Sequence, residues 1–331
     1  MAEELSLGSR PLQGFWTLRG YRLVDFLTQG YVALIGALVL VFHGDELRLW
    51  PLYVGGHVAV LAVAHALIQW SRRSASGFVR MLRAFYPMIL YTFLYTETHH
   101  LDGLFYGGYL DGFVIDLDQL IFGSQLSRTL MAGLPHLWLS ETLYLFYFSY
   151  YVMVLSVGLG MYFKERAHFW EYITIVSFLF FACYLTYIFV PVMGPHGTQR
   201  GVVFAGKLAS VGPRIAPGNL SNGVFYRLMA VIYRLVEPEG GAAFPSSHVV
   251  VAVATLWFTW RHFRTMRWVH LVAVVMLCIS TVYCGYHYAA DVLAGLAAAA
   301  VLVPVGELVY RKWGGRAPEE AQPGGASPAP A

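Results

Sequence analysis

Residues 240–258 read GGAAFPSSHVVVAVATLWF, and residues 280–295 read STVYCGYHYAADVLAG. In both stretches serine, histidine or aspartate residues lie next to or within a run of apolar residues. Such apolar runs are typical of helices that are buried in a protein or in a membrane. Polar and ionisable residues beside or within these helices are costly to bury, and they usually have a partner and a function. The two stretches therefore predict a helical membrane protein with a polar site at the ends of its helices.

The composition of the whole chain supports this fold class. Of its 331 residues, 57% are hydrophobic and 12% are charged, and the mean hydropathy is +0.56. A soluble domain carries about 25% charged residues. These values exclude disordered, collagen-like and disulfide-rich chains, and the three cysteines show no metal-ligand spacing. A formal net charge of +3 is too small to indicate a nucleic-acid partner.

The apolar runs are long enough to predict several membrane spans. A helix needs about 20 residues to cross the hydrocarbon core of a bilayer. We predict an all-α, polytopic bundle of about eight transmembrane helices, near residues 25–42, 51–70, 84–96, 139–162, 168–190, 246–260, 268–283 and 286–309. No signal peptide is expected at the N-terminus. The tail at 311–331 is rich in Gly, Pro and Ala, and this composition predicts disorder.

The basic residues predict the orientation of the bundle. With eight spans, 15 of the 22 Lys and Arg residues lie on the side of the two termini, and 7 lie on the other side. Loops rich in Lys and Arg stay in the cytoplasm. We therefore expect both termini in the cytoplasm and the two long non-spanning segments, 97–138 and 191–245, on the extracytoplasmic face. Within the first, residues 111–130 are expected to form an amphipathic helix in the membrane interface.

The first polar cluster is Pro245-Ser246-Ser247-His248, which opens an apolar helix. Serine at a helix start can cap free backbone N–H groups, and proline suits the first turn. The same N–H groups also form a ready site for an anion. The sequence leaves both interpretations open for Ser246 and Ser247: simple capping, or binding of a phosphate group.

The second cluster pairs His287 with Asp291, four residues later. In a helix this spacing brings both side chains to one face, where the carboxylate can hold one ring nitrogen and fix the tautomer. The alternative is a structural hydrogen bond between helices. Two crossings separate His248 from His287, so both should lie at the same membrane face. Two histidines and an aspartate at a helix start suit phosphoryl transfer.

These motifs resemble those of the type 2 phosphatidic acid phosphatase superfamily, whose blocks read Lys-x6-Arg-Pro, Pro-Ser-Gly-His and Ser-Arg-x5-His-x3-Asp. The second block is similar to residues 245–248, with Ser247 in place of Gly. The third is similar to Ser280-Thr281, five residues, His287, three residues and Asp291. The Tyr-rich third block without arginine looks closest to the inositol phosphorylceramide synthase-like branch, an inositolphosphotransferase branch.

The resemblance implies a role for each matched residue. His287 would be the nucleophile that forms a phosphohistidine, Asp291 would orient it, and His248 would be the general acid. It also implies a six-helix catalytic core at 81–310, preceded by a two-helix extension at 1–80. The implied substrate is a lipid phosphate or phospholipid in the bilayer, with no cofactor and no metal. The oligomeric state is left open.

The first block of the family is matched least well. Lys207 and Arg214 have the spacing of this block, but Ile215 follows where proline is expected, and Thr281 replaces the arginine of the third block. Arg200 competes for the same role. A basic group is needed to neutralise phosphate charge in the transition state, and each of the three could also be a solvated loop residue.

Other polar residues have simpler interpretations. The segment Glu97, His99, His100, Asp102 carries metal-ligand types, although a polar interfacial loop is the favoured interpretation. We expect His57 and His65 to form interhelical hydrogen bonds, and Glu141 to lie favourably near a helix start.

Three functions compete at this stage. The first is a lipid phosphatase, or a phosphotransferase if an alcohol such as inositol or ceramide replaces water. The second is a proton-coupled transporter or channel that uses the His287–Asp291 pair as a relay. The third is a non-catalytic membrane scaffold.

Overall fold

The computed structural model describes residues 18–45, 47–105, 107–195, 220–236 and 242–314. Within these ranges the chain is helical and contains no β-strand: α1 (Leu23–Phe42), α2 (Trp50–Arg73), α3 (Gly77–Leu101), α4 (Asp111–Phe122), α5 (Leu126–Gly133), α6 (Leu137–Lys164), α7 (Arg166–Phe189), α8 (Val224–Val236), α9 (Ser247–His262), α10 (Arg267–Tyr283) and α11 (Ala289–Val309). The all-α fold predicted from the sequence is confirmed.

Each of the eight predicted spans corresponds to one of these helices. Five helices are both long and apolar enough to cross a membrane, namely α1, α2, α6, α7 and α11. They indicate a multi-pass membrane protein. The third predicted span was too short, because α3 continues through charged residues at both of its ends. One of these, Arg83, is buried in an ion pair with Asp25 of α1, whose carboxylate also accepts the hydroxyl of Tyr86 at 2.8 Å.

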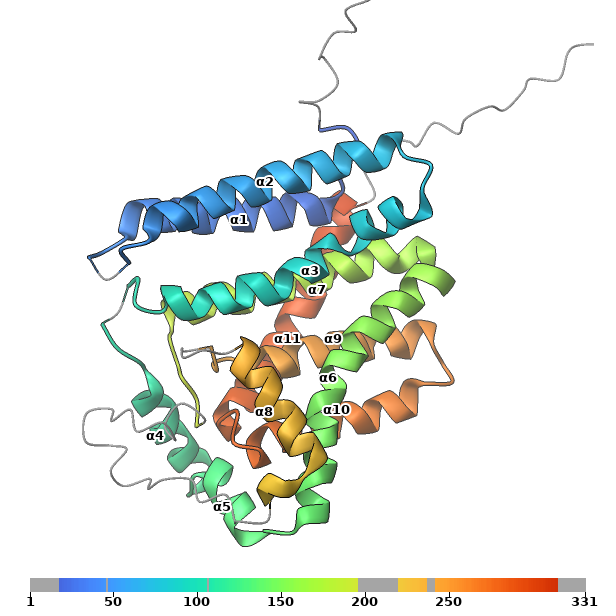
Figure 1. The fold of residues 1–331 in the computed structure, drawn as a ribbon. Coiled ribbons are helices and arrows are strands. Elements are labelled where there is room, and N and C mark those ends of the chain that lie inside the picture. Colours follow the sequence, from blue (N-terminus) through green and yellow to red (C-terminus); the bar gives the residue numbers. More distant parts are fainter. Residues whose placement is uncertain (1–17, 46, 106, 196–219, 237–241, 315–331) are drawn as a thin grey trace, which may run out of the picture.

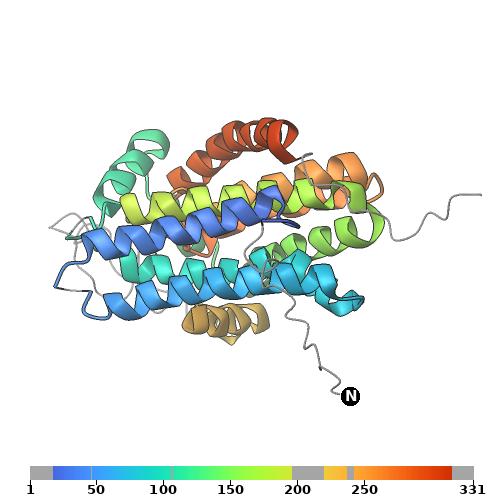
Figure 2. The same ribbon diagram turned by 90° about the horizontal axis from the view of Figure 1, so that it is seen from above.

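The helices pack around α7, which contacts α1, α3, α6, α9 and α11. In Figure 1, the α1–α2 hairpin lies along one side of the α3–α7 pair, α9 and α10 lie on the other side, and α11 crosses the pair. Figure 2 shows that the long helices run roughly side by side, with α8 on the flank of the bundle and α4 at one end. This packing places the start of α9 deep inside the protein.

Two expectations about the non-spanning segments need correction. Residues 111–130 do not form one helix, because Gly123 adopts φ +68° and ends α4, and α5 begins at Leu126. The segment 191–245 contains α8, which the sequence analysis missed. Its first turn is capped by Glu141 of α6, whose carboxylate accepts the backbone N–H groups of Phe225 and Tyr226 at 2.9 and 3.0 Å. Glu141 therefore serves the start of α8 as well as lying near the start of its own helix.

The remaining polar residues of the N-terminal half connect helices. His57 of α2 lies 3.4 Å from the carboxylate of Glu97 on α3, and His65 lies 2.8 Å from the hydroxyl of Tyr21 ahead of α1. The His57 contact joins two helices without a hydrogen bond from Nε2 to a described residue, and the His65 contact reaches a residue outside the helices, so the expected interhelical hydrogen bonds are met only in part. Among the described residues, the ligand atoms of Glu97, His99, His100 and Asp102 do not gather into a metal-binding group, because Glu97 faces α2 instead.

Candidate active site

The two histidines singled out in the sequence meet inside the bundle. His248 lies in the first turn of α9, and His287 lies in the turn between α10 and α11. Nδ1 of His248 is 3.3 Å from Nε2 of His287, and both side chains are buried. The hairpin formed by α9 and α10 brings the two residues together across 39 positions of sequence.

Asp291 contacts the other ring nitrogen of His287. Its Oδ2 atom accepts the backbone N–H of Tyr288 at 2.8 Å and lies 3.3 Å from Nδ1 of His287. The carboxylate therefore caps α11 and holds the imidazole at the same time. The sequence spacing suggested that His287 lies on the face of a helix with Asp291. In the structure His287 precedes α11. Gly285, with φ +67°, makes the turn that aims His287 at its partner.

His248 is held from its other side by a tyrosine. Its Nε2 atom lies 3.2 Å from the hydroxyl of Tyr147 on α6, which in turn is hydrogen-bonded to the hydroxyl of Tyr233 on α8. One set of tautomers satisfies every contact: Tyr147 donates to His248, His248 donates through Nδ1 to His287, and His287 donates through Nδ1 to Asp291. In that arrangement Nε2 of His287 carries a lone pair directed towards His248.

The two serines behave differently from simple helix caps. Ser246 occupies the N-cap position of α9, but its hydroxyl makes no capping bond. It is buried, and it has no hydrogen-bond partner among the described residues. The capping interpretation is therefore wrong for Ser246. Its backbone N–H donates to the carbonyl of Asp291 at 3.1 Å, and that of Ser247 donates to the hydroxyl of Tyr187 at 3.1 Å.

Two carboxylates on α4 support the site, and the sequence analysis missed both. Asp118 accepts the backbone N–H groups of Ala290 at 2.7 Å and Ala289 at 3.3 Å, so it caps the start of α11 from another helix. Asp111 accepts the hydroxyl of Tyr288 at 3.0 Å. It also accepts the N–H groups of Met193 and Gly194 at 2.8 and 2.9 Å. The signal in the sequence is their spacing of seven residues, which places both on one face of the helix.

These two carboxylates lie outside the spanning helices, and both are fully buried. Burial raises the pKa of Asp111 to about 6, against the opposing effect of its hydrogen bonds to Met193, Tyr288 and Gly194. Burial also raises the pKa of Asp118, while its bonds to Ala290 and Ala289 lower it. With a pKa of about 6, Asp111 is ionised at neutral pH and can accept hydrogen bonds with both oxygens.

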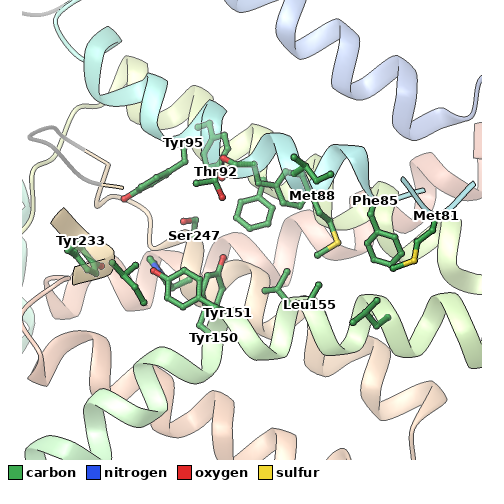
Figure 3. Close-up of a pocket in the computed structure, with 18 residues that line it drawn as sticks. Met81, Phe85, Met88, Thr92, Tyr95, Tyr150, Tyr151, Leu155, Tyr233 and Ser247 are labelled. Carbon is green, nitrogen blue, oxygen red and sulfur yellow. Dashed lines mark hydrogen bonds between the residues drawn. The ribbon is translucent and has the colours of Figure 1, made fainter. Parts of the chain in front are cut away.

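A groove of about 470 Å³ leads from Ser247 and His248 into the apolar part of the bundle. Figure 3 shows Ser247, Tyr150, Tyr151 and Tyr233 at one end and Met81 and Phe85 at the other. The groove is lined mainly by apolar and aromatic side chains of α3 and α6, with further residues from α7 and α8, and His248 belongs to its lining. The remaining candidates, Arg200, Lys207 and Arg214, lie outside the described residues.

Comparison with known proteins identifies a family. A family model described as the PAP2 superfamily matches residues 114–305, which include Asp118, His248, His287 and Asp291. Neither the curated proteins nor the solved structures yield a significant match. The match does not single out the inositol phosphorylceramide synthase-like branch. The match covers more than half of the chain, and the chain therefore belongs to the PAP2 superfamily.

The caps on α11 lead to a prediction for Asp118. Asp118→Asn removes the charge that holds the N–H groups of Ala289 and Ala290, so the neighbouring His287 loses its position. We expect kcat for hydrolysis of a lipid phosphate to fall by about tenfold, since a hydrogen bond to a charged group contributes about 1.5–3 kcal/mol. KM should stay unchanged, because Asp118 does not line the groove. Steady-state kinetics in detergent measure both constants.

The matched control is Asp116→Asn on the exposed face of the same helix, which should behave as wild type. A raised KM with unchanged kcat in Asp118→Asn would contradict a positioning role.

Proposed function

We propose, from its membership of the PAP2 superfamily and from the paired histidines, that this protein transfers phosphoryl groups from lipid phosphoesters. Membership by itself supports a lipid phosphoesterase in general. The observation that carries the finer proposal is the junction of two features. His248 lines an apolar groove and contacts His287, which is backed by a carboxylate, so that a lipid in the groove would place its head group beside the histidine pair.

The proposed reaction has two steps. Nε2 of His287 attacks phosphorus, the P–N bond forms as the P–O bond to the lipid breaks, and His248, in its protonated form, donates a proton to the leaving oxygen. The oxygen of water or an alcohol then attacks the phosphohistidine, a new P–O bond forms as the P–N bond breaks, and His248, now neutral, takes up the proton of that hydroxyl. Asp291 stabilises the positive charge on His287. The two rings now contact each other at 3.3 Å, so a bound phosphoryl group must replace this contact.

The phosphate would be held at the start of α9. The buried hydroxyl of Ser246 has no partner among the described residues, and Ser247 lines the groove beside His248. Both can donate hydrogen bonds to phosphate oxygens. Among the basic residues, Arg200, Lys207 and Arg214 remain the proposed source of positive charge. This assignment of roles requires no metal ion.

The groove supports a substrate with a hydrocarbon chain. Its walls are apolar side chains such as Met88, Val154 and Leu155, which favour an acyl or alkyl chain through burial of apolar surface. None of its described lining residues comes from α1 or α2. This distribution supports a division into a two-helix extension at 1–80 and a catalytic core at 81–310.

Water and an alcohol are alternative acceptors for the second step. Water makes the protein a phosphatase, and a lipid or inositol hydroxyl makes it a phosphotransferase. Transfer of phosphoinositol to a lipid acceptor is the form of the proposal that the sequence resemblance favours. Analysis of the products formed from labelled phospholipid with and without candidate alcohols distinguishes hydrolysis from transfer.

The histidines should differ in their dependence on the leaving group. His287→Ala should abolish trapping of an acid-labile phosphoenzyme with every substrate. His248→Ala should slow turnover of a lipid phosphate by about 10²–10⁴-fold, the usual contribution of general acid catalysis, but should retain much of its activity on an aryl phosphate, whose leaving group needs little protonation. Asp291→Asn should lie between the two. Rates on both substrates and trapping of phosphoprotein provide the measurement.

Thermal melting of each variant controls for loss of fold. If His248→Ala, and not His287→Ala, blocks phosphoprotein trapping, the two roles are reversed. If neither substitution matters, the site lies elsewhere.

Filling the groove should affect a lipid substrate and not a soluble one. Leu155→Trp fills the groove, and we expect KM for a long-chain lipid phosphate to rise by about tenfold, because overpacking an apolar site costs about 1–3 kcal/mol. Turnover of a soluble aryl phosphate should be unchanged. Val152→Trp is the matched control, since Val152 lies on the same helix, is 52% exposed where Leu155 is 50% exposed, and does not line the groove. Equal effects of both substitutions would argue against lipid binding there.

The orientation is proposed from the charge distribution, with the histidines on the extracytoplasmic face. Ser221 and Arg264 are both exposed and belong to the loops on opposite sides of the predicted bundle. In intact cells an impermeant thiol reagent should label Ser221→Cys and spare Arg264→Cys. The two sites have comparable access to solvent, so a reversed pattern would place the histidines on the cytoplasmic face.

A further inference from the structure

A second group of ionisable side chains lies at the end of α9 that is remote from His248. His262 is the last residue of α9, Glu165 lies in the turn between α6 and α7, and His168 lies in the first turn of α7. Fourteen residues separate His248 from His262, which corresponds to about 21 Å along the helix axis. The group is therefore distinct from the proposed active site.

The three side chains converge on one point. Their possible ligand atoms all lie within 4.8 Å of one another. Nδ1 of His262 is 3.7 Å from Oε2 of Glu165, and the ring centroids of His168 and His262 are 4.6 Å apart. A fourth residue, Glu171, lies one turn further along α7, with Oε2 at 3.6 Å from Nδ1 of His168.

We propose that Glu165, His168 and His262 form a binding site for Zn²⁺ or a similar divalent transition-metal ion. Two imidazoles and one carboxylate are ligands that zinc takes in proteins, with a fourth position left for water. Zinc binds these atoms at about 2.0–2.2 Å, so small rotations of the three side chains close the site. His168 is 48% exposed and Glu165 is 37% exposed, so an ion can enter from water.

The surrounding charges favour a cation. Two carboxylates, Glu165 and Glu171, border the site. The arginines next to the ligands in sequence make contacts with other groups. Arg261 pairs with Glu307 at 2.5 Å, and Arg166 stacks over the ring of Tyr162 at 4.5 Å.

Glu171 has the position of a supporting residue. A ligating histidine usually donates its other ring N–H to a carboxylate, which orients the ring and raises the basicity of the ligating nitrogen. The contact between Glu171 and Nδ1 of His168 provides such a partner. The remaining nitrogen of His168 is then available to the ion.

A bound ion would join the α6–α7 turn to the end of α9. Of the residues proposed for catalysis, His248 lies on α9, and its partner Tyr147 lies on α6. An ion that binds the folded protein and not the unfolded chain stabilises the fold by mass action. The site would thus act as a cross-link on the face opposite the histidine pair.

The test uses the full-length protein in detergent and ZnCl₂ as the probe. Competition with a chromophoric chelator should give one high-affinity Zn²⁺ per chain, and Zn²⁺ should raise the thermal melting temperature. His262→Ala and Glu165→Gln should each weaken binding by about tenfold or more and remove the thermal shift, and Glu171→Gln should weaken binding by about tenfold. His100→Ala, at an exposed histidine of the 97–102 segment, should bind as wild type does.

The proposal is overturned if His262→Ala or Glu165→Gln, whichever folds, binds Zn²⁺ as tightly as wild type. It is also overturned if His100→Ala alone loses the ion, because the ligands would then lie in the 97–102 segment. Hydrolysis of a lipid phosphate in EDTA gives a separate readout. Activity should persist, since none of the proposed ligands contacts the paired histidines, and this result distinguishes a failed metal site from a failed catalytic proposal.

Discussion

The carboxylate of Asp291 is the group on which the architecture of the site depends. A charge buried inside a helical bundle requires hydrogen-bond donors, and Asp291 obtains them from the ring of His287 and the backbone N–H of Tyr288. These contacts fix the turn before α11 and the tautomer of the histidine together. The carbonyl of the same residue accepts the N–H of Ser246, so the start of α9 is aligned with it. The positions of both histidines follow from this residue.

Two further carboxylates extend the same principle outward. Asp118 on α4 accepts a backbone N–H at the start of α11, close to His287. Asp111 on the same helix accepts the N–H of Gly194, which follows α7. The short helix α4 thereby becomes part of the site through these hydrogen bonds. The polar network continues on the other side through Tyr147 to Tyr233 of α8. Helices outside the predicted spans thus hold the paired histidines from both directions.

The groove explains how such a polar site can serve an apolar substrate. Buried polar groups in a membrane protein are tolerated where they pair with one another or line a cavity. The two histidines contact each other, and His248 also lines the groove. The groove between α3 and α6 would thus join the proposed phosphoryl transfer to a compartment for hydrocarbon. The opposite end of α9, where Glu165 and His262 approach each other, is open to water and suits an ion. One helix therefore connects two chemically different environments.

The sequence by itself determined the fold class and the approximate positions of eight helices, because apolar length is a local property. It also singled out His248, His287 and Asp291, whose side chains the structure brings together. It could not determine contacts that depend on how distant helices pack. Asp118 and Glu141 cap helices other than their own, and Ser246 makes no capping bond although it occupies an N-cap position. The sequence also could not predict the groove or the convergence of Glu165, His168 and His262, because both depend on how separate helices pack. Backbone N–H groups at a helix start can donate to any carboxylate within reach, and only the tertiary structure decides which carboxylate that is.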